Sequence, residues 1–252
     1  MANIQPATIA KRIDDQINAR LLSMSSFIEA NDFQMLRWED EIRQLQQADA
    51  ASAFICRALL AHMRGDIVAM EQHMLAAERL KHPAISSGLA RLCAYSNLGF
   101  ATKALDYFRG CVDIKYGNLC ESAVTGCCIG AFQQLGTIMD QARAANLELP
   151  YGSQMAIMGQ AAMVLQRLGV TDDQCAKVVD AAGEVLRNRK LFWKDLYPQI
   201  TVNEQEGTVA MRMRVDTTAQ EASVMTIETA DKLIAQDLDT MPFYVHFLGM
   251  QA

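Results

Sequence analysis

Apolar residues recur at helical spacing through most of the chain, and two similar units near its middle show the pattern most clearly. The first unit covers residues 54–83 and turns at Gly65, and the second covers residues 88–111 and turns at Gly99. Each predicts an apolar helix, a tight turn and a second apolar helix. The turn glycines are 34 residues apart (99 − 65 = 34), a period typical of stacked helical hairpins.

The same alternation of helix and turn continues on both sides of this pair. Further turns are predicted at Asn31, Gly136 and Gly169, so that five helical hairpins account for residues 14–188. The last helix opens with Thr171 and, three residues later, Gln174, which predicts a capping box at its N-terminus. Residues 1–13 form a polar lead-in.

Near the C-terminus the apolar period changes from helical spacing to two. Alternating residues from Gln199 predict two strands joined by a turn at Gly207, and the segment after Thr218 predicts a helix. A last strand, residues 242–248, is apolar on both faces, and we expect it to be central in its sheet. Residues 199–252 are therefore predicted to form a ββαβ unit that docks on the helices, with residues 189–198 as a capping linker.

The central units resemble tetratricopeptide (TPR) repeats. The matching residues are Ala58, Gly65, Ala77 and Pro83 in one unit and Tyr95, Gly99, Ala104, Phe108 and Cys111 in the next. The resemblance implies a mainly α fold, a right-handed superhelix of about five TPR-like hairpins, followed by the small α+β unit. It also implies that the first helix of each hairpin lines a concave, partner-binding wall.

Carried over to this chain, the resemblance implies a protein-binding groove. Its residues would be Leu21, Ile55, Leu59, His62, Met63, Leu89, Cys93, Asn97, Met163 and Arg167. Where chaperone-binding relatives of the TPR family carry a Lys/Asn carboxylate clamp, this chain has Ile55, Leu59, Leu89 and Cys93. The expected ligand is therefore an apolar helix or extended segment of a partner protein.

Composition narrows the class of protein. Of 252 residues, 51% are hydrophobic and 21% are charged, which favours a packed core over disorder. The net charge of −6 argues against general nucleic-acid binding. The sequence shows neither a signal peptide nor a run of roughly 18 apolar residues, the length a membrane span needs. Seven cysteines inside helical patterns suit a reducing compartment, so we expect a cytoplasmic protein without a membrane span.

Candidate chemistry is sparse. His62 and His73 lack the spacing of a zinc-protease helix, and the Cys120, Cys127, Cys128 cluster lacks the C-x-x-C spacing of a zinc site. Arg212 and Arg214 share a predicted strand face, where an acidic partner or pairing across the sheet would engage them. We therefore expect no metal and no cofactor.

These observations favour a non-enzymatic interaction scaffold, an adaptor or chaperone for an apolar protein segment. The first alternative is a structural or assembly component that uses the ββαβ unit for docking or for forming a homo-oligomer. The second alternative is an enzyme or nucleic-acid module within residues 199–252. The partner, the oligomeric state and the role of the ββαβ unit stay open at this point.

Overall fold

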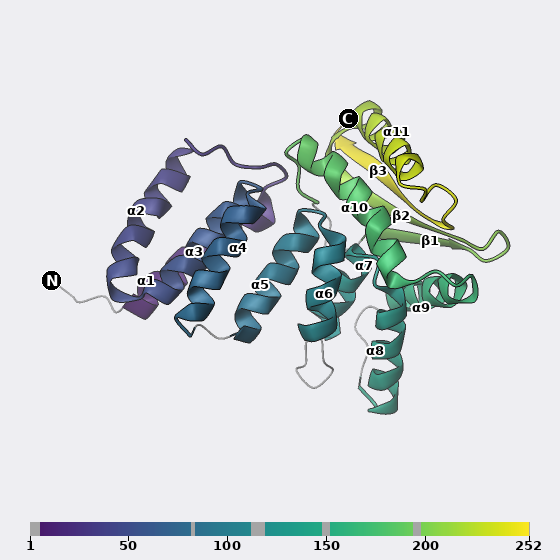
Figure 1. Cartoon of the computed structure of the whole chain (residues 1–252), viewed down its shortest axis with the longest axis horizontal. Coiled ribbons are helices and arrows are strands. Elements are labelled where there is room, and N and C mark those ends of the chain that lie inside the picture. Colours follow the sequence, from purple (N-terminus) through teal and green to yellow (C-terminus); the bar gives the residue numbers. More distant parts are fainter. Residues whose placement is uncertain (1–5, 82–83, 112–118, 148–151, 194–197, 252) are drawn as a thin grey trace. The chain divides into compact units, whose positions relative to one another are not determined.

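The computed structural model describes residues 6–81, 84–111, 119–147, 152–193 and 198–251 (Figure 1). The described chain is mainly helical with a small three-stranded sheet near the C-terminus, which confirms the predicted fold class at that level. It divides into two compact units, residues 1–94 (unit 1) and residues 95–252 (unit 2). The boundary falls inside helix α5.

Unit 1 is built around one central helix. Its helices are α1 (Pro6–Ser23), α2 (Phe33–Ala48), α3 (Ala50–Met63), α4 (Ile67–Arg79) and most of α5 (Ala84–Asn97). Helix α3 packs against α1, α2 and α4. The core contains Ile13, Ile17, Met35, Trp38, Ile42, Leu45, Met63, Met70 and Met74. These residues are the apolar positions that recur at helical spacing.

Aspartates begin the helices of unit 1 at regular intervals. Asp32, Asp49 and Asp66 stand 17 residues apart (49 − 32 = 17; 66 − 49 = 17), and each side chain accepts backbone N–H bonds in the first turn of α2, α3 or α4. Gly65 has a φ of 71°, a conformation that favours glycine, and Phe27 lies where a Cβ would be. The predicted turn at Gly65 is confirmed.

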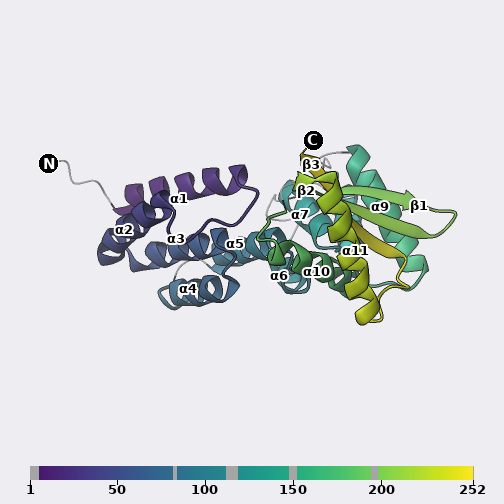
Figure 2. The ribbon, with the colours of Figure 1, turned by 90° about the horizontal axis from the view of Figure 1, so that it is seen from above.

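Unit 2 is arranged around α10. Its further helices are α6 (Ala101–Cys111), α7 (Leu119–Cys128), α8 (Phe132–Ala144), α9 (Gly152–Arg167), α10 (Asp172–Asn188) and α11 (Ala219–Ala235). Helix α10 lies between α6 and α11 and also contacts α8 and β3 (Figures 1 and 2). The two helices on either side of Gly169, α9 and α10, therefore pack mainly against other elements and not against each other. Helix α9 contacts α8, β1 and β2.

The predicted ββαβ order is confirmed. Strands β1 (Gln199–Asn203) and β2 (Thr208–Thr218) are antiparallel, and β3 (Phe243–Gln251) runs parallel to β2 after the α11 crossover. Helix α9 packs against β1 and β2, while α11 packs against β3 and β2 (Figure 2). The buried sheet face carries Val209, Met211, Met213, Val215, Phe243, Val245 and Phe247.

Two expectations about unit 2 are wrong. The last strand, β3, is at the sheet edge and β2 is central. The hydroxyl of Thr226 in α11 accepts a 3.0 Å bond from the Phe247 N–H, so a helix covers the flank that a further strand would have covered. The turn predicted at Gly136 is at Gly130 instead (φ 76°), and Gly136 lies inside α8.

Candidate functional site

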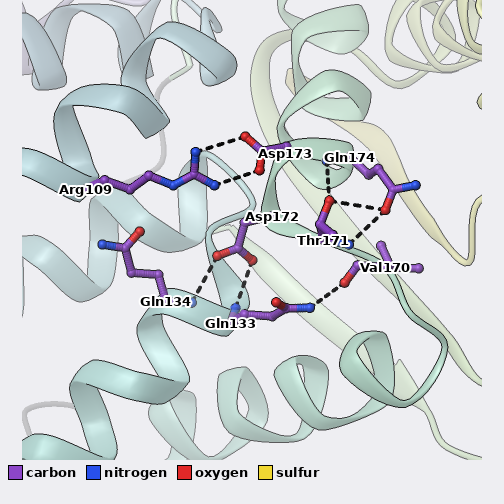
Figure 3. A network of polar contacts seen from close by, with 8 residues as sticks. All are labelled: Arg109, Gln133, Gln134, Val170, Thr171, Asp172, Asp173 and Gln174. Atoms are coloured by element: carbon purple, nitrogen blue, oxygen red, sulfur yellow. Dashed lines mark hydrogen bonds and ion pairs between the residues drawn. The ribbon is translucent and has the colours of Figure 1, made fainter.

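Polar residues of α10 hold the ends of neighbouring helices in unit 2. Helix α8 has no cap from its own N-cap residue, Ala131. Instead, the N–H groups of Gln133 and Gln134 donate to the two carboxylate oxygens of Asp172 at 2.9 and 3.0 Å (Figure 3). Burial raises the pKa of the Asp172 carboxyl, and the two N–H donors oppose part of that increase.

The same face of α10 engages the turn before α6. The Thr102 N–H donates to Asp180 at 3.2 Å, and Arg187 donates to the carbonyls of Leu98 and Gly99 at 2.8 and 2.7 Å. The positions of Asp172, Asp180 and Arg187 differ by 8 and 7 residues (180 − 172 = 8; 187 − 180 = 7), which places them on one side of a helix. Helix α10 therefore supplies both N-terminal and C-terminal caps to other helices.

Two glycines allow the backbones to meet beside these caps. A Cβ added to Gly183 of α10 would lie 1.9 Å from the Gly99 oxygen, and one added to Gly99 would lie 2.4 Å from the Gly183 Cα. Any side chain at either position would force the two segments apart.

Ion pairs connect α10 and its C-terminal end to α11. Arg189 donates to Glu228 at 2.7 and 2.8 Å and to Glu221 at 2.6 Å, and Lys232 donates to Glu184 at 2.5 Å. Bonding to Glu228 and Glu221 raises the pKa of Arg189 above its ordinary value. These ion pairs and the buried side of α11 together fix the orientation of the helix, and so determine which of its residues face solvent.

The candidate site is the outer face of α11. The inner face consists of Ala222, Met225, Thr229 and Leu233, all buried. The outer face carries Val224, Ile227 and Ile234, which are 40%, 62% and 59% exposed. Their spacing of three and seven residues places these three large apolar side chains along one stripe, which we name the α11 outer face. Such a stripe suits contact with an apolar surface of another protein.

The structure distributes the ten predicted groove residues between buried and exposed positions. Leu59, His62 and Met63 are buried in unit 1, and burial lowers the pKa of His62 to about 4. Met63 is 0% exposed, because α1 and residues 24–32 pack near the end of α3, and the Ile28 N–H donates to the Met63 carbonyl at 3.0 Å. It offers no surface to a partner in this conformation.

The other seven predicted residues have surface exposed. In unit 1, Leu21, Ile55 and Leu89 are half-buried and Cys93 is exposed. In unit 2, Asn97, Arg167 and Met163 are exposed, the last at 62%. The backbone carbonyl of Asn97 accepts a 3.2 Å hydrogen bond from the backbone N–H of Trp193.

The pocket of unit 1, which the sequence pattern did not predict, lies on another side of α3. Arg57 and Arg64, seven residues apart on one helical face, take part in lining a pocket of about 270 Å³. None of the ten predicted groove residues lines it. In the sequence, the only signal for this pocket was the seven-residue spacing of Arg57 and Arg64. The same spacing is also found on a solvated helix face.

The remaining candidate residues are placed as follows. Cys56, Cys127, Cys128 and Cys175 are buried, and burial raises the pKa of the Cys56 thiol to about 12. The side chain of Cys120 lies outside the described residues. Among the residues described, no three His, Cys, Asp or Glu side chains are grouped to hold a metal ion. Arg212 is exposed on the outer sheet face beside His246, its β3 partner in register.

No described helix combines the length and hydrophobicity that crossing a membrane requires. No model of a protein family matches the sequence, and comparisons with curated proteins and with solved structures gave no significant match.

Proposed function

We propose that this chain is a non-enzymatic scaffold that binds an apolar segment of a partner protein, with the α11 outer face as its main contact surface. The observation that carries the proposal is the two-sided apolar character of α11. Its inner side is packed, yet Ile227 and Ile234 remain about three-fifths exposed on the other side. A helix that is apolar on both sides is normally covered on both sides.

The surroundings of the stripe suit a protein interface. Charged residues on α11, Glu221, Glu228 and Lys232, engage α10 or its end, while Asp231 is exposed between the apolar residues. An apolar centre with polar groups around it is the usual arrangement of a protein–protein contact. Because ion pairs and core packing already hold α11, little ordering is needed when a partner binds.

The TPR-like organisation of residues 14–188 is part of the proposal. It is supported by the turn glycines Gly65 and Gly99, both with positive φ, and by the capping aspartates of unit 1 at half the repeat length. The exposed groove residues of unit 2, Met163 and Arg167, would then form a second contact surface. A cytoplasmic location fits the buried thiols of Cys56, Cys127 and Cys175, which form no disulfide.

A pair of charge-introducing variants tests the proposal. Ile227→Glu with Ile234→Glu places two charges on the α11 outer face, whereas Met163→Glu places one on the equally exposed α9 surface. We expect the double variant to lose partners that co-purify with the wild-type chain and are identified by mass spectrometry, with its circular dichroism unchanged. If Met163→Glu loses these partners and the double variant keeps them, the contact surface is the predicted groove instead of the α11 outer face.

A second candidate function, assembly through the ββαβ unit, is favoured by the free edge of β1. Among the described strands β1 pairs only with β2, so its other edge can accept a strand from another chain. Light scattering of the full chain over a concentration series separates the two functions. A dimer that persists in the double α11 variant would favour the strand edge, and a monomer throughout would exclude self-assembly.

A further inference from the structure

The pocket of unit 1 is lined by three helices, and two of its three arginines, Arg57 and Arg64, lie on α3 or at its C-terminal end. Its residues are Glu39 and Arg43 of α2, Arg57, Leu60 and Ala61 of α3 with Arg64 at the C-cap of that helix, and Asp66, Ala69 and His73 at and within α4. Arg57, Leu60, Ala61 and Arg64 follow the spacing of one helical face. We name this site the α3 pocket.

The two acidic groups of the α3 pocket already have partners. Glu39 pairs with Arg64 across the pocket wall. Asp66 caps α4 by accepting the Ala69 N–H at 3.0 Å. Arg43 pairs with Asp40, which does not line the pocket, at 2.9 Å.

Arg57 differs from the other two arginines. Its guanidinium donates to the neutral amide oxygen of Gln46 at 2.7 Å and lies 5.7 Å from the Phe54 ring centroid. In the part of the chain that the structure describes, no carboxylate pairs with it. The Nε–H of Arg64 is also buried without a hydrogen-bond acceptor among the described residues. The pocket thus offers cationic donors without matching acceptors.

His73 adds a polar group beside Arg57. Burial, followed by the charge of Arg57, lowers the pKa of His73, while Asp66 opposes that decrease. The imidazole is therefore neutral at pH 7 and offers one N–H donor without adding charge. Its ring lies 6.0 Å from that of Phe54.

We propose that the α3 pocket binds a carboxylate group, with Arg57 as its anchor. Arg43 and Arg64 are paired with Asp40 and Glu39, so Arg57 is the arginine of the pocket that no described carboxylate pairs, and a singly charged carboxylate can pair with it. A phosphate dianion would add a surplus negative charge beside Glu39 and Asp66. The forked guanidinium matches the two oxygens of a carboxylate, and a volume of about 270 Å³ suits a group the size of an acidic side chain.

Two sources can supply this carboxylate. Where it is an acidic side chain of the partner segment, the inference rests on the proposed function. A free carboxylate ligand would be independent of it. The two are distinguished by an acetyl-Gly-Glu-Gly-amide peptide and by acetate, with the matching Gln peptide and inorganic phosphate as comparisons.

The test is a titration of the full-length chain followed by NMR of the histidine side chains, with His73 assigned from His73→Gln. A bound carboxylate stabilises the protonated imidazole, so we expect a saturable rise in the His73 pKa with the Glu peptide and none with the Gln peptide. Groups that face His73 and set its starting pKa are Arg57 of α3 and Asp66 at the start of α4. Binding of the Glu peptide but not acetate identifies a side chain of a partner, and equal binding identifies a free carboxylate.

Three variants make the assignment specific. Arg57→Gln should weaken binding at least about tenfold, because a charge-assisted bond is lost. Asp66→Asn should tighten it severalfold, since asparagine keeps the α4 cap while one negative charge leaves the pocket. Arg37→Gln, on α2 but outside the pocket and 58% exposed, should leave binding unchanged.

Several results would overturn the inference. These are no saturable change in His73, equal weakening by Arg57→Gln and Arg37→Gln, or tighter binding of phosphate than of carboxylate. If Arg57→Gln does not fold, the opposite effect expected of Asp66→Asn still decides the matter. Because these probes report on unit 1, their failure is distinct from a failure of the α11 outer face to hold a partner.

Discussion

Helices α3 and α10 occupy corresponding positions at the centres of unit 1 and unit 2, yet they organise their surroundings differently. Helix α3 packs apolar residues such as Leu59 and Met63 against its neighbours and turns Arg57 and Arg64 toward a pocket. Helix α10 directs polar side chains at the backbone ends of other helices. Apolar packing tolerates small rearrangements, whereas backbone caps and backbone contacts depend on fixed positions.

This contrast bears on function as well. In unit 1 the polar face of the central helix lines the α3 pocket, whereas in unit 2 the polar face of the central helix bonds the ends of neighbouring helices. The helix that α10 holds, α11, carries the α11 outer face, with Ile227 and Ile234 about three-fifths exposed. The chain has one tryptophan in each unit, Trp38 and Trp193, so Trp→Phe backgrounds allow the unfolding of each unit to be followed separately.

The largest effect is expected from Gly183→Ala. The added Cβ would meet the Gly99 backbone, which cannot move without displacing α6, so we expect a loss of about 3 kcal/mol in the free energy of unfolding. Urea unfolding followed by Trp193 fluorescence measures it. The control is Gly136→Ala inside α8, where the nearest atom would be 3.5 Å away and a gain of about 0.5–1 kcal/mol is expected. Equal effects at both positions would contradict the backbone contact.

A smaller loss is expected from Asp172→Ala. It leaves the N–H groups of Gln133 and Gln134 at the start of α8 without an acceptor, at a cost of about 1–2 kcal/mol. The same Trp193 measurement applies, and the Trp38 transition of unit 1 should not change. A value near zero would mean that water replaces the carboxylate at the α8 terminus.

Asp172 and Asp173 should give opposite pH dependences. Burial raises the folded-state pKa of Asp172 above its unfolded value near 3.8, so its favourable contribution declines as pH rises beyond 3.8. The cost of Asp172→Asn should therefore be largest near pH 3.5 and smaller at pH 7. Bonding to Arg109 lowers the pKa of Asp173, so the cost of Asp173→Asn should instead be present at pH 7 and lost as pH falls below 3.8. Parallel pH profiles would refute these assignments.

The smallest effect is expected from Asp173→Ala at neutral pH. Its side chain is 55% exposed although it bonds Arg109 at 2.8 and 2.9 Å. Exposed ion pairs contribute about 0–1 kcal/mol, and salt screens them. The difference from wild type should shrink when the unfolding is repeated at 1 M sodium chloride; an increase would show that the pair is shielded from solvent.

The sequence predicted features that depend on neighbouring residues. The turns at Gly65 and Gly99 and the Thr171–Gln174 capping box are confirmed, as is the ββαβ order. The turn predicted at Gly136 is wrong because the start of α8 is fixed from outside by Asp172, 39 residues away from Gln133. The expectation that the last strand is central in the sheet was also wrong, because an edge strand that is covered by a helix is as apolar as a central strand.

The candidate sites were harder to predict for a related reason. Leu59 and Met63 have the composition of an apolar groove, but the packing of α1 and residues 24–32 makes them core. From the sequence, the exposed stripe of α11 is expected to be buried, because no feature of the neighbouring residues distinguishes exposed Ile227 from buried Leu233. The spacing of Arg57 and Arg64 predicts only that they share a helical face. The pocket is formed by residues of α2 and α4 as well, which the sequence does not place beside that face.

The most direct test of the central claim is site-specific photo-crosslinking in the source cell, with a benzophenone amino acid in place of Ile227 in one variant and of Met163 in another. Both side chains are 62% exposed, so their chance of random encounters is similar. The proposal predicts a defined crosslinked partner from position 227 that is weak or missing from position 163. No defined product from position 227, or the same products in equal yield from both positions, would contradict it.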